Sequence, residues 1–63
     1  MIMTNRELKT ATENARPYAR SIRQIDNGLL SIIWLDGRHV VYHALDDVFN
    51  RIAWLCAIGI VNL

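Results

Sequence analysis

Residues 26–44 of this chain, DNGLLSIIWLDGRHVVYHA, decide its fold. Two runs rich in Ile, Val, Trp and Tyr, residues 29–35 and 38–44, stand on either side of Asp36-Gly37. Such side chains are enriched in strands, and an Asp-Gly pair between them favours a two-residue hairpin turn whose central residues both take positive φ. The stretch therefore predicts an antiparallel β-hairpin.

The length of that loop sets the register of the two strands. A two-residue loop pairs Leu35 with Arg38 and Trp34 with His39, and side chains then alternate between the two faces of the sheet. One predicted face holds Leu29, Ile33, Leu35, Val40, Tyr42 and Ala44; the other holds Leu30, Ile32, Trp34, His39, Val41 and His43. Both faces are largely apolar, whereas in a sheet with one solvent-exposed face apolar and polar residues alternate more regularly along each strand. We therefore expect cover on both faces, from one helix on each or from a second subunit.

The segment before the hairpin, residues 18–25, has two interpretations. The turn signal at residues 26–28 allows it to become a third strand of an antiparallel meander. Alternatively, the preceding helix continues through this segment with a kink at Pro17. Proline disfavours helical geometry in the residue before it, so the first interpretation ends the helix near Arg16.

A capping box marks the start of an N-terminal helix. Thr4 can accept a hydrogen bond from the amide of Glu7, whose side chain can reach back to the amide of Thr4. The apolar stripe of this helix is thin and consists of Leu8, Ala11 and Ala15. Its small side chains predict a close approach to the element on which the helix packs.

A C-terminal helix is predicted from about Asp46, which suits the N-cap position, to Gly59, which suits the C′ position. Its expected core face comprises Val48, Phe49, Ile52, Ala53, Leu55 and Cys56. The opposite side begins polar and becomes apolar at Trp54 and Ile58, and a helix that is apolar nearly all round is expected to be buried all round. The apolar tail, residues 60–63, could add a short strand.

The composition favours an oligomer. The 63 residues form a single small domain, residues 1–63, which is 52% hydrophobic, has a mean hydropathy of +0.14 and carries a net charge of +1. Disordered chains are poorer in apolar residues, so this chain is expected to fold. A monomer of this size buries only about 60% of the surface that its unfolded chain exposes, which leaves apolar surface for a partner. We expect a homodimer or higher oligomer that also binds another protein. Its predicted interface residues are Trp34, Trp54, Ile58, Ile32 and Val41, with the two tryptophans as anchors.

Arginine supplies most of the basic residues. Arg16, Arg20 and Arg23 lie close together in the sequence. They share one face only on a kinked helix, because a strand turns Arg20 and Arg23 to opposite sides. Together with Arg38 they are the candidate contacts for an anion or a nucleic acid. The nearly neutral net charge makes DNA or RNA binding the alternative function and not the preferred one.

No sequence pattern points to catalysis or to a bound metal or cofactor. His39 and His43 stand four residues apart on a predicted strand, about 13 Å, which is too far for both to ligate one zinc ion. Cys56 has apolar neighbours, which predict a buried and unreactive thiol. A chain of this length leaves little room for a closed pocket. We expect no cofactor, no metal and no enzymatic activity.

Neither a secretory signal nor a transmembrane segment is predicted. The chain begins without a basic region followed by an apolar run. The apolar stretch 52–63 is shorter than the roughly 20 residues that a membrane-spanning helix needs. A cytoplasmic protein is the consistent expectation, and peripheral membrane association through the C-terminal helix is a third alternative.

Two resemblances bear on function. Over residues 28–55, the order strand, Asp-Gly turn, strand and acid-capped helix resembles the arm-type DNA-binding domains of phage integrases, which implies DNA binding. The strands here carry Trp, Ile and Val where those domains carry Lys and Arg. The small size, single cysteine and apolar composition are similar to those of small phage-encoded proteins that bind and block a host protein, which implies an inhibitor.

These observations predict an α+β fold with an N-terminal helix, a two- or three-stranded antiparallel meander and an apolar C-terminal helix. The predicted function is a non-enzymatic protein-interaction module, a small homodimeric regulator or inhibitor that binds another protein. The alternative is a small DNA- or RNA-binding regulator that uses Arg16, Arg20 and Arg23. The dependence of binding on salt concentration distinguishes the two functions, because nucleic-acid complexes weaken steeply as the salt concentration rises.

Overall fold

The computed structural model describes residues 2–60 of the chain. Its elements, in chain order, are α1 (Asn5–Ala15), the short 3-10 helix η1 (Arg16–Tyr18), β1 (Ala19–Asp26), β2 (Leu29–Trp34), β3 (His39–Tyr42) and α2 (Leu45–Ala57). The strands form one antiparallel sheet in the order β1-β2-β3. The predicted α+β fold is confirmed, with three strands. The strand expected in the tail falls largely on residues 61–63, which lie outside the described residues.

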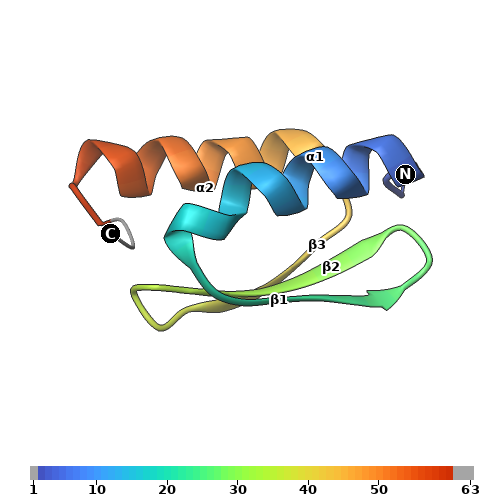
Figure 1. Cartoon of the computed structure of the whole chain (residues 1–63), viewed down its shortest axis with the longest axis horizontal. Helices are drawn as coiled ribbons and strands as arrows, with labels where there is room; N and C mark the ends of the chain where they lie inside the picture. The colour runs from blue at the N-terminus through green and yellow to red at the C-terminus, as the bar shows by residue number, and fades with distance from the viewer. Residues whose placement is uncertain (1, 61–63) are drawn as a thin grey trace.

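The molecule has two layers, one of helices and one formed by the sheet (Figure 1). α1 and α2 lie side by side on the same face of the sheet and run in the same direction, while the other face carries no helix. The expectation of one helix on each face is therefore wrong. The reason is the register of the β2–β3 hairpin, which places most of the large apolar side chains on one face.

The β2–β3 loop has three residues and not two. The Trp34 amide donates to the Arg38 carbonyl at 2.8 Å, and the Gly37 amide donates to the Trp34 carbonyl at 2.9 Å. Gly37 has φ +92°, and no described residue other than glycine has a positive φ. This is the three-residue hairpin loop that ends on a left-handed glycine. Because of the extra residue, Ile33 faces His39, so the predicted register is wrong by one residue.

The corrected register sorts the side chains cleanly between the two faces. The face under the helices carries Ala19, Ile22, Leu30, Ile32, Trp34, Val40 and Tyr42, all buried or half-buried. Trp34 and Ile32 are 0% exposed at its centre. The open face carries Ser21, Arg23, Ser31, Ile33, His39 and Val41. The open face is therefore mixed in polarity and is not a second apolar face.

The capping box that starts α1 is confirmed. The Thr4 hydroxyl accepts from the Glu7 amide at 3.2 Å, and the Glu7 carboxylate accepts from the Thr4 amide at 3.0 Å. The stripe of Leu8, Ala11 and Ala15 is buried, and α1 packs closely against α2. α1 ends before Pro17, and the backbone is already extended at Ala19. The alternative of a kinked helix through residues 18–23 is therefore wrong.

The two ends of α2 differ in how well they were predicted. The N-cap is Ala44, so Asp46 lies in the first turn and is not the cap; there it still suits the positive end of the helix dipole. Gly59 is the C′ residue, with φ +82°. Its amide donates to the Cys56 carbonyl at 3.2 Å, and the Ile60 amide donates to the Leu55 carbonyl at 3.0 Å. These two bonds form a Schellman motif.

A close contact ties the start of the chain to the β1–β2 turn. The Met3 amide donates to the Gly28 carbonyl at 3.1 Å, and Met3 is buried in the core. Gly28 has φ +89°, and a Cβ placed on it would lie 2.6 Å from the Cβ of Ile2. Only glycine satisfies both the backbone angle and the contact at this position.

Candidate interaction surfaces

One side of α2 presents apolar side chains to solvent. We name as the α2 strip the exposed residues Asn50, Ala53, Trp54, Ala57 and Ile58. Trp54 is 46% exposed and Ile58 is 49% exposed. Their spacing of four residues places them on the same side of the helix. Because exposed apolar side chains are adjacent here, this side of α2 is a candidate surface for binding.

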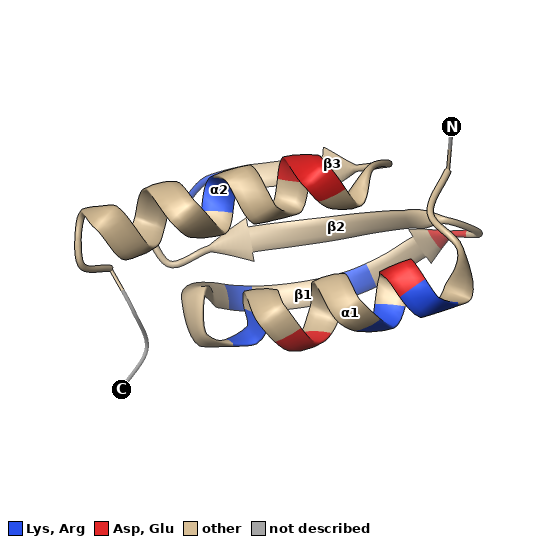
Figure 2. Cartoon of the chain, turned by 90° about the horizontal axis from the view of Figure 1, so that it is seen from above, with Lys and Arg blue, Asp and Glu red and all other residues tan. Residues whose placement is uncertain are grey.

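Most of the α2 strip lies on the part of the helix that carries no charged residues (Figure 2). Asp46 and Asp47 lie in the first turn of α2, Arg51 is the next charge, and residues 52–58 carry none. The guanidinium of Arg51 lies 4.9 Å from the centre of the Trp54 ring, a cation–π contact. These two residues line a shallow depression of about 400 Å³ with Arg38 and Asn50. The strip thus has a cationic margin on one side.

The five predicted interface residues do not form one surface. Trp54 and Ile58 come together on the α2 strip, and Val41, which is 48% exposed, lies on the open face of the sheet in the other layer. Trp34 and Ile32 are fully buried within the chain, where they have no surface to offer a partner. The assignment of these two residues to an interface does not fit this fold, because both helices cover the face of the sheet that carries them.

The expected core face of α2 is also only partly right. Val48 and Leu55 are fully buried and Ile52 is half-buried, whereas Phe49, Ala53 and Cys56 are exposed. A helix that rests on a sheet beside one other helix buries only part of its circumference.

The four candidate anion-binding arginines are dispersed. Arg16 follows α1, and Arg20 lies at a register shift in β1. Arg23 lies on the open face, opposite Ser31. Arg38 lies beyond the β2–β3 loop, with its Nε 3.8 Å from the Asp36 carboxylate. The structure brings together only Arg16 and Arg20, which line the same depression of about 200 Å³.

The remaining polar candidates have local roles. His39 shares a hydrogen bond with Ser31 on the open face, through its Nε2 and the serine Oγ. Cys56 is exposed and not buried as predicted. The neighbouring Cys56 side chain raises the pKa of the Tyr18 phenol above its ordinary value of 10.0. Within residues 2–60, no three His, Cys, Asp or Glu side chains are grouped to hold a metal ion, and no helix could cross a membrane.

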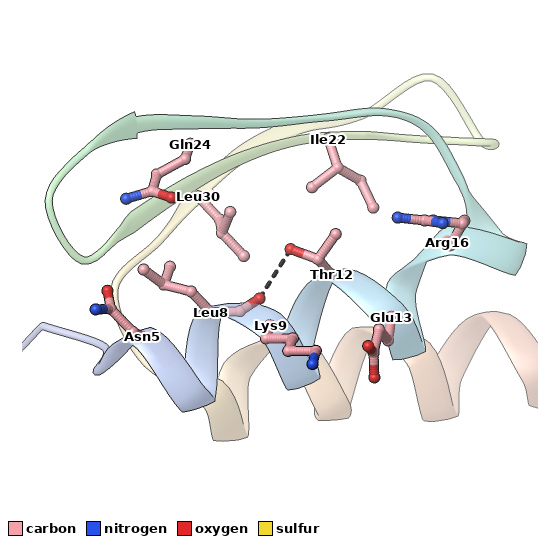
Figure 3. Close-up of a pocket in the computed structure, with 9 residues that line it drawn as sticks. All are labelled: Asn5, Leu8, Lys9, Thr12, Glu13, Arg16, Ile22, Gln24 and Leu30. Atoms are coloured by element: carbon pink, nitrogen blue, oxygen red, sulfur yellow. Dashed lines mark hydrogen bonds between the residues drawn. The ribbon is translucent and has the colours of Figure 1, made fainter.

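A groove lies between α1 and β1 (Figure 3). Its volume is about 610 Å³, and its apolar floor consists of Leu8, Ile22 and Leu30. Its rim carries Asn5, Lys9, Thr12, Glu13, Arg16 and Gln24. The Thr12 hydroxyl is already used, because it donates to the Leu8 carbonyl at 2.8 Å. Sequence reasoning missed this groove, although Asn5, Lys9, Thr12 and Arg16 follow each other at helical spacing along one flank of α1.

Comparison of the chain with protein-family models, with curated proteins and with solved structures found no match.

Proposed function

We propose that this chain is a non-enzymatic protein-interaction module, a small regulator or inhibitor that forms a homodimer through the α2 strip and binds another protein. The observation that carries the proposal is the exposure of Trp54 and Ile58 on the same side of one helix. Tryptophan is enriched among the residues that contribute most to protein interfaces. Ala53 and Ala57, which flank Trp54 on the same side of the helix, are small and allow the backbone of a partner helix to approach closely.

The distribution of charge supports an antiparallel pairing of the two copies of α2. Asp46 and Asp47 are both in the first turn of the helix. A parallel pairing would bring four carboxylates together, whereas an antiparallel two-fold arrangement separates them. A standard interface buries about 800 Å² on each partner, and the chain exposes 4289 Å². Such an interface contains roughly 20–30 residues on each side, far more than the strip, so it must extend to neighbours such as Arg51 and Arg38.

Sedimentation velocity over the micromolar range tests the dimer. We expect the wild-type chain to sediment at twice its mass of 7.3 kDa. Trp54→Ala and Ile58→Ser remove apolar contact area and are expected to shift the chain to monomer. The matched control is Ile25→Ser, because Ile25 is 50% exposed but lies on β1, away from α2. A stable wild-type monomer, or equal dissociation of the control, contradicts the proposal.

A further inference from the structure

The outer edge of β1 offers unpaired backbone groups. β1 is at one end of the described three-stranded sheet, so its second edge faces solvent. The Trp34 amide donates to the Arg38 carbonyl, on the β3 side of β2. The next amide, that of Leu35, donates to the Tyr18 carbonyl, on the β1 side. Antiparallel ladders alternate in this way along a strand.

That alternation identifies the free groups of β1. It directs the amides and carbonyls of Ser31 and Ile33 toward β1, where their partners are Arg23 and Ser21. Ile22 and Gln24 consequently point their own N–H and C=O groups away from β2, toward the free edge. Register shifts near Arg20 and Ile25 interrupt the ladder on either side. The regular and accessible part of the edge is therefore residues 21–24.

The groove beside this edge would hold the side chains of an added strand. Ile22 and Gln24 direct their side chains toward α1, where they line the groove with Leu8 and Leu30 (Figure 3). In a strand paired to β1, the residues opposite Ile22 and Gln24 would point to the same side. Leu8 and Leu30 are nearly fully buried, so the floor that receives these side chains is apolar.

The margin of the groove has an excess of positive charge. α1 contributes Lys9 and Glu13, which offset each other, and Arg16 stands at the far end of the groove. Arg16 also lines the adjoining depression with Arg20. Within residues 2–60, neither arginine forms an ion pair. Guanidinium groups without an ion-pair partner favour binding to carboxylates.

We propose that this groove binds an extended, acidic peptide of a partner protein, which adds to the sheet as a fourth strand beside β1. The peptide runs antiparallel to β1, so that its C-terminal end carries the acidic residues to Arg16 and Arg20. Strand addition at an exposed sheet edge is a general mode of peptide recognition, with backbone bonds for affinity and alternate side chains for specificity. The inference rests on the proposed function, because it names the partner of the same module.

A synthetic peptide that alternates valine with threonine and ends in two glutamates is the probe. We expect it to shift the amide NMR signals of Ile22 and Gln24 and to slow the hydrogen exchange of these amides. The double variant Arg16→Glu/Arg20→Glu is expected to weaken binding about tenfold or more, as the loss of bonds to charged groups does. Arg6→Glu is the matched control, because Arg6 is exposed on α1 but does not line the groove.

A second pair of variants separates backbone pairing from side-chain contact. Gln24→Pro removes the outward amide, which an edge strand tolerates, and is expected to abolish binding. Gln24→Ala keeps the amide and removes only a side chain at the rim of the groove, so it is expected to weaken binding much less than Gln24→Pro does. Circular dichroism checks that each variant is folded. Equal loss of peptide binding in both variants contradicts strand addition. Binding that leaves the amide signals of β1 unchanged contradicts it as well.

The outcomes also distinguish this inference from the α2 dimer. Groove variants should leave sedimentation unchanged, and Trp54→Ala should leave peptide binding unchanged. A single-stranded oligonucleotide is the rival ligand. If it binds through Arg16 and Arg20 while the peptide leaves the β1 amides unshifted, the groove is a phosphate site and the peptide proposal is overturned.

Discussion

The indole N–H of Trp34 donates a 2.9 Å hydrogen bond to the hydroxyl of Tyr42, and the two rings meet edge to face with their centroids 5.9 Å apart. Both side chains are buried beneath the helices, and they come from neighbouring strands. This pair lets the core hold two polar aromatic groups without leaving the indole donor unsatisfied.

Tyr42→Phe should destabilise the fold by about 1–3 kcal/mol, because it keeps the ring but leaves the buried Trp34 N–H without an acceptor. Urea denaturation followed by tryptophan fluorescence measures the loss. Val41→Ala, at an exposed position of the same strand, is the control and should change stability by less than about 0.5 kcal/mol. Similar stabilities for both variants would show that the hydrogen bond contributes nothing.

Gly28→Ala should destabilise the chain more than Gly37→Ala. Both glycines have a positive φ near 90°, which costs alanine about 1–2 kcal/mol. Only at Gly28 does the added Cβ also meet another atom, at Ile2; around Gly37 there is open space. The difference between the melting temperatures of the two variants measures the cost of the contact with Ile2. Adding Ile2→Gly to Gly28→Ala should recover part of the difference, and no recovery would refute the clash.

Thr4→Ala should cost about 1 kcal/mol, because it removes the acceptor for the Glu7 amide at the start of α1. Glu7→Ala should cost less, since it frees only the exposed Thr4 amide. Glu13→Ala, on the exposed middle of the same helix, serves as the control. Chemical denaturation of the three variants gives the ranking, and a larger loss for Glu13→Ala would contradict it.

Cys56→Ala should lower the pKa of Tyr18 toward 10.0, since the Cys56 side chain is the main cause of the increase. A raised pKa in the folded state means that stability falls as the pH rises from the unfolded toward the folded pKa. The variant should therefore lose less stability on alkaline titration than the wild type. NMR titration of the Tyr18 ring measures the pKa directly, and an unchanged value would contradict the assignment.

The sequence signals that depend on neighbouring residues were the reliable ones. The capping box at Thr4, the end of α1 before Pro17 and the C′ position of Gly59 were all predicted, because each is set by groups within a few residues. The third strand was also among the predicted alternatives. Local chemistry therefore defines most of the element boundaries in this chain.

The hairpin register was not predictable from the turn alone. Asp36-Gly37 suits both a two-residue and a three-residue loop. The three-residue loop places Tyr42 beside Trp34 and moves His39 to the open face, so the choice depends on what the helices cover. The Asp36 carboxylate also accepts from the Arg38 amide at 3.1 Å, which supports the longer loop. Contacts between distant segments decided this point.

The exposed surfaces were predicted least well. Phe49 and Cys56 were assigned to the core, although α2 is covered only by the sheet and by α1. The groove beside β1 depends on how α1 lies over an edge strand, and no short motif in the sequence encodes that. Trp54 and Ile58 were found because they are apolar residues left over on the helix after its core face is filled.

The pairing of α1 with α2 joins the first and last elements within residues 2–60. As the chain emerges from the ribosome, Ala11 and Ala15 have no helix to lie against until residues 45–57 have been made. The hairpins are local and can form early, but the core closes only when α2 arrives. We therefore expect the fold to be gained and lost in a single cooperative step, with no stable intermediate formed by the N-terminal part of the chain.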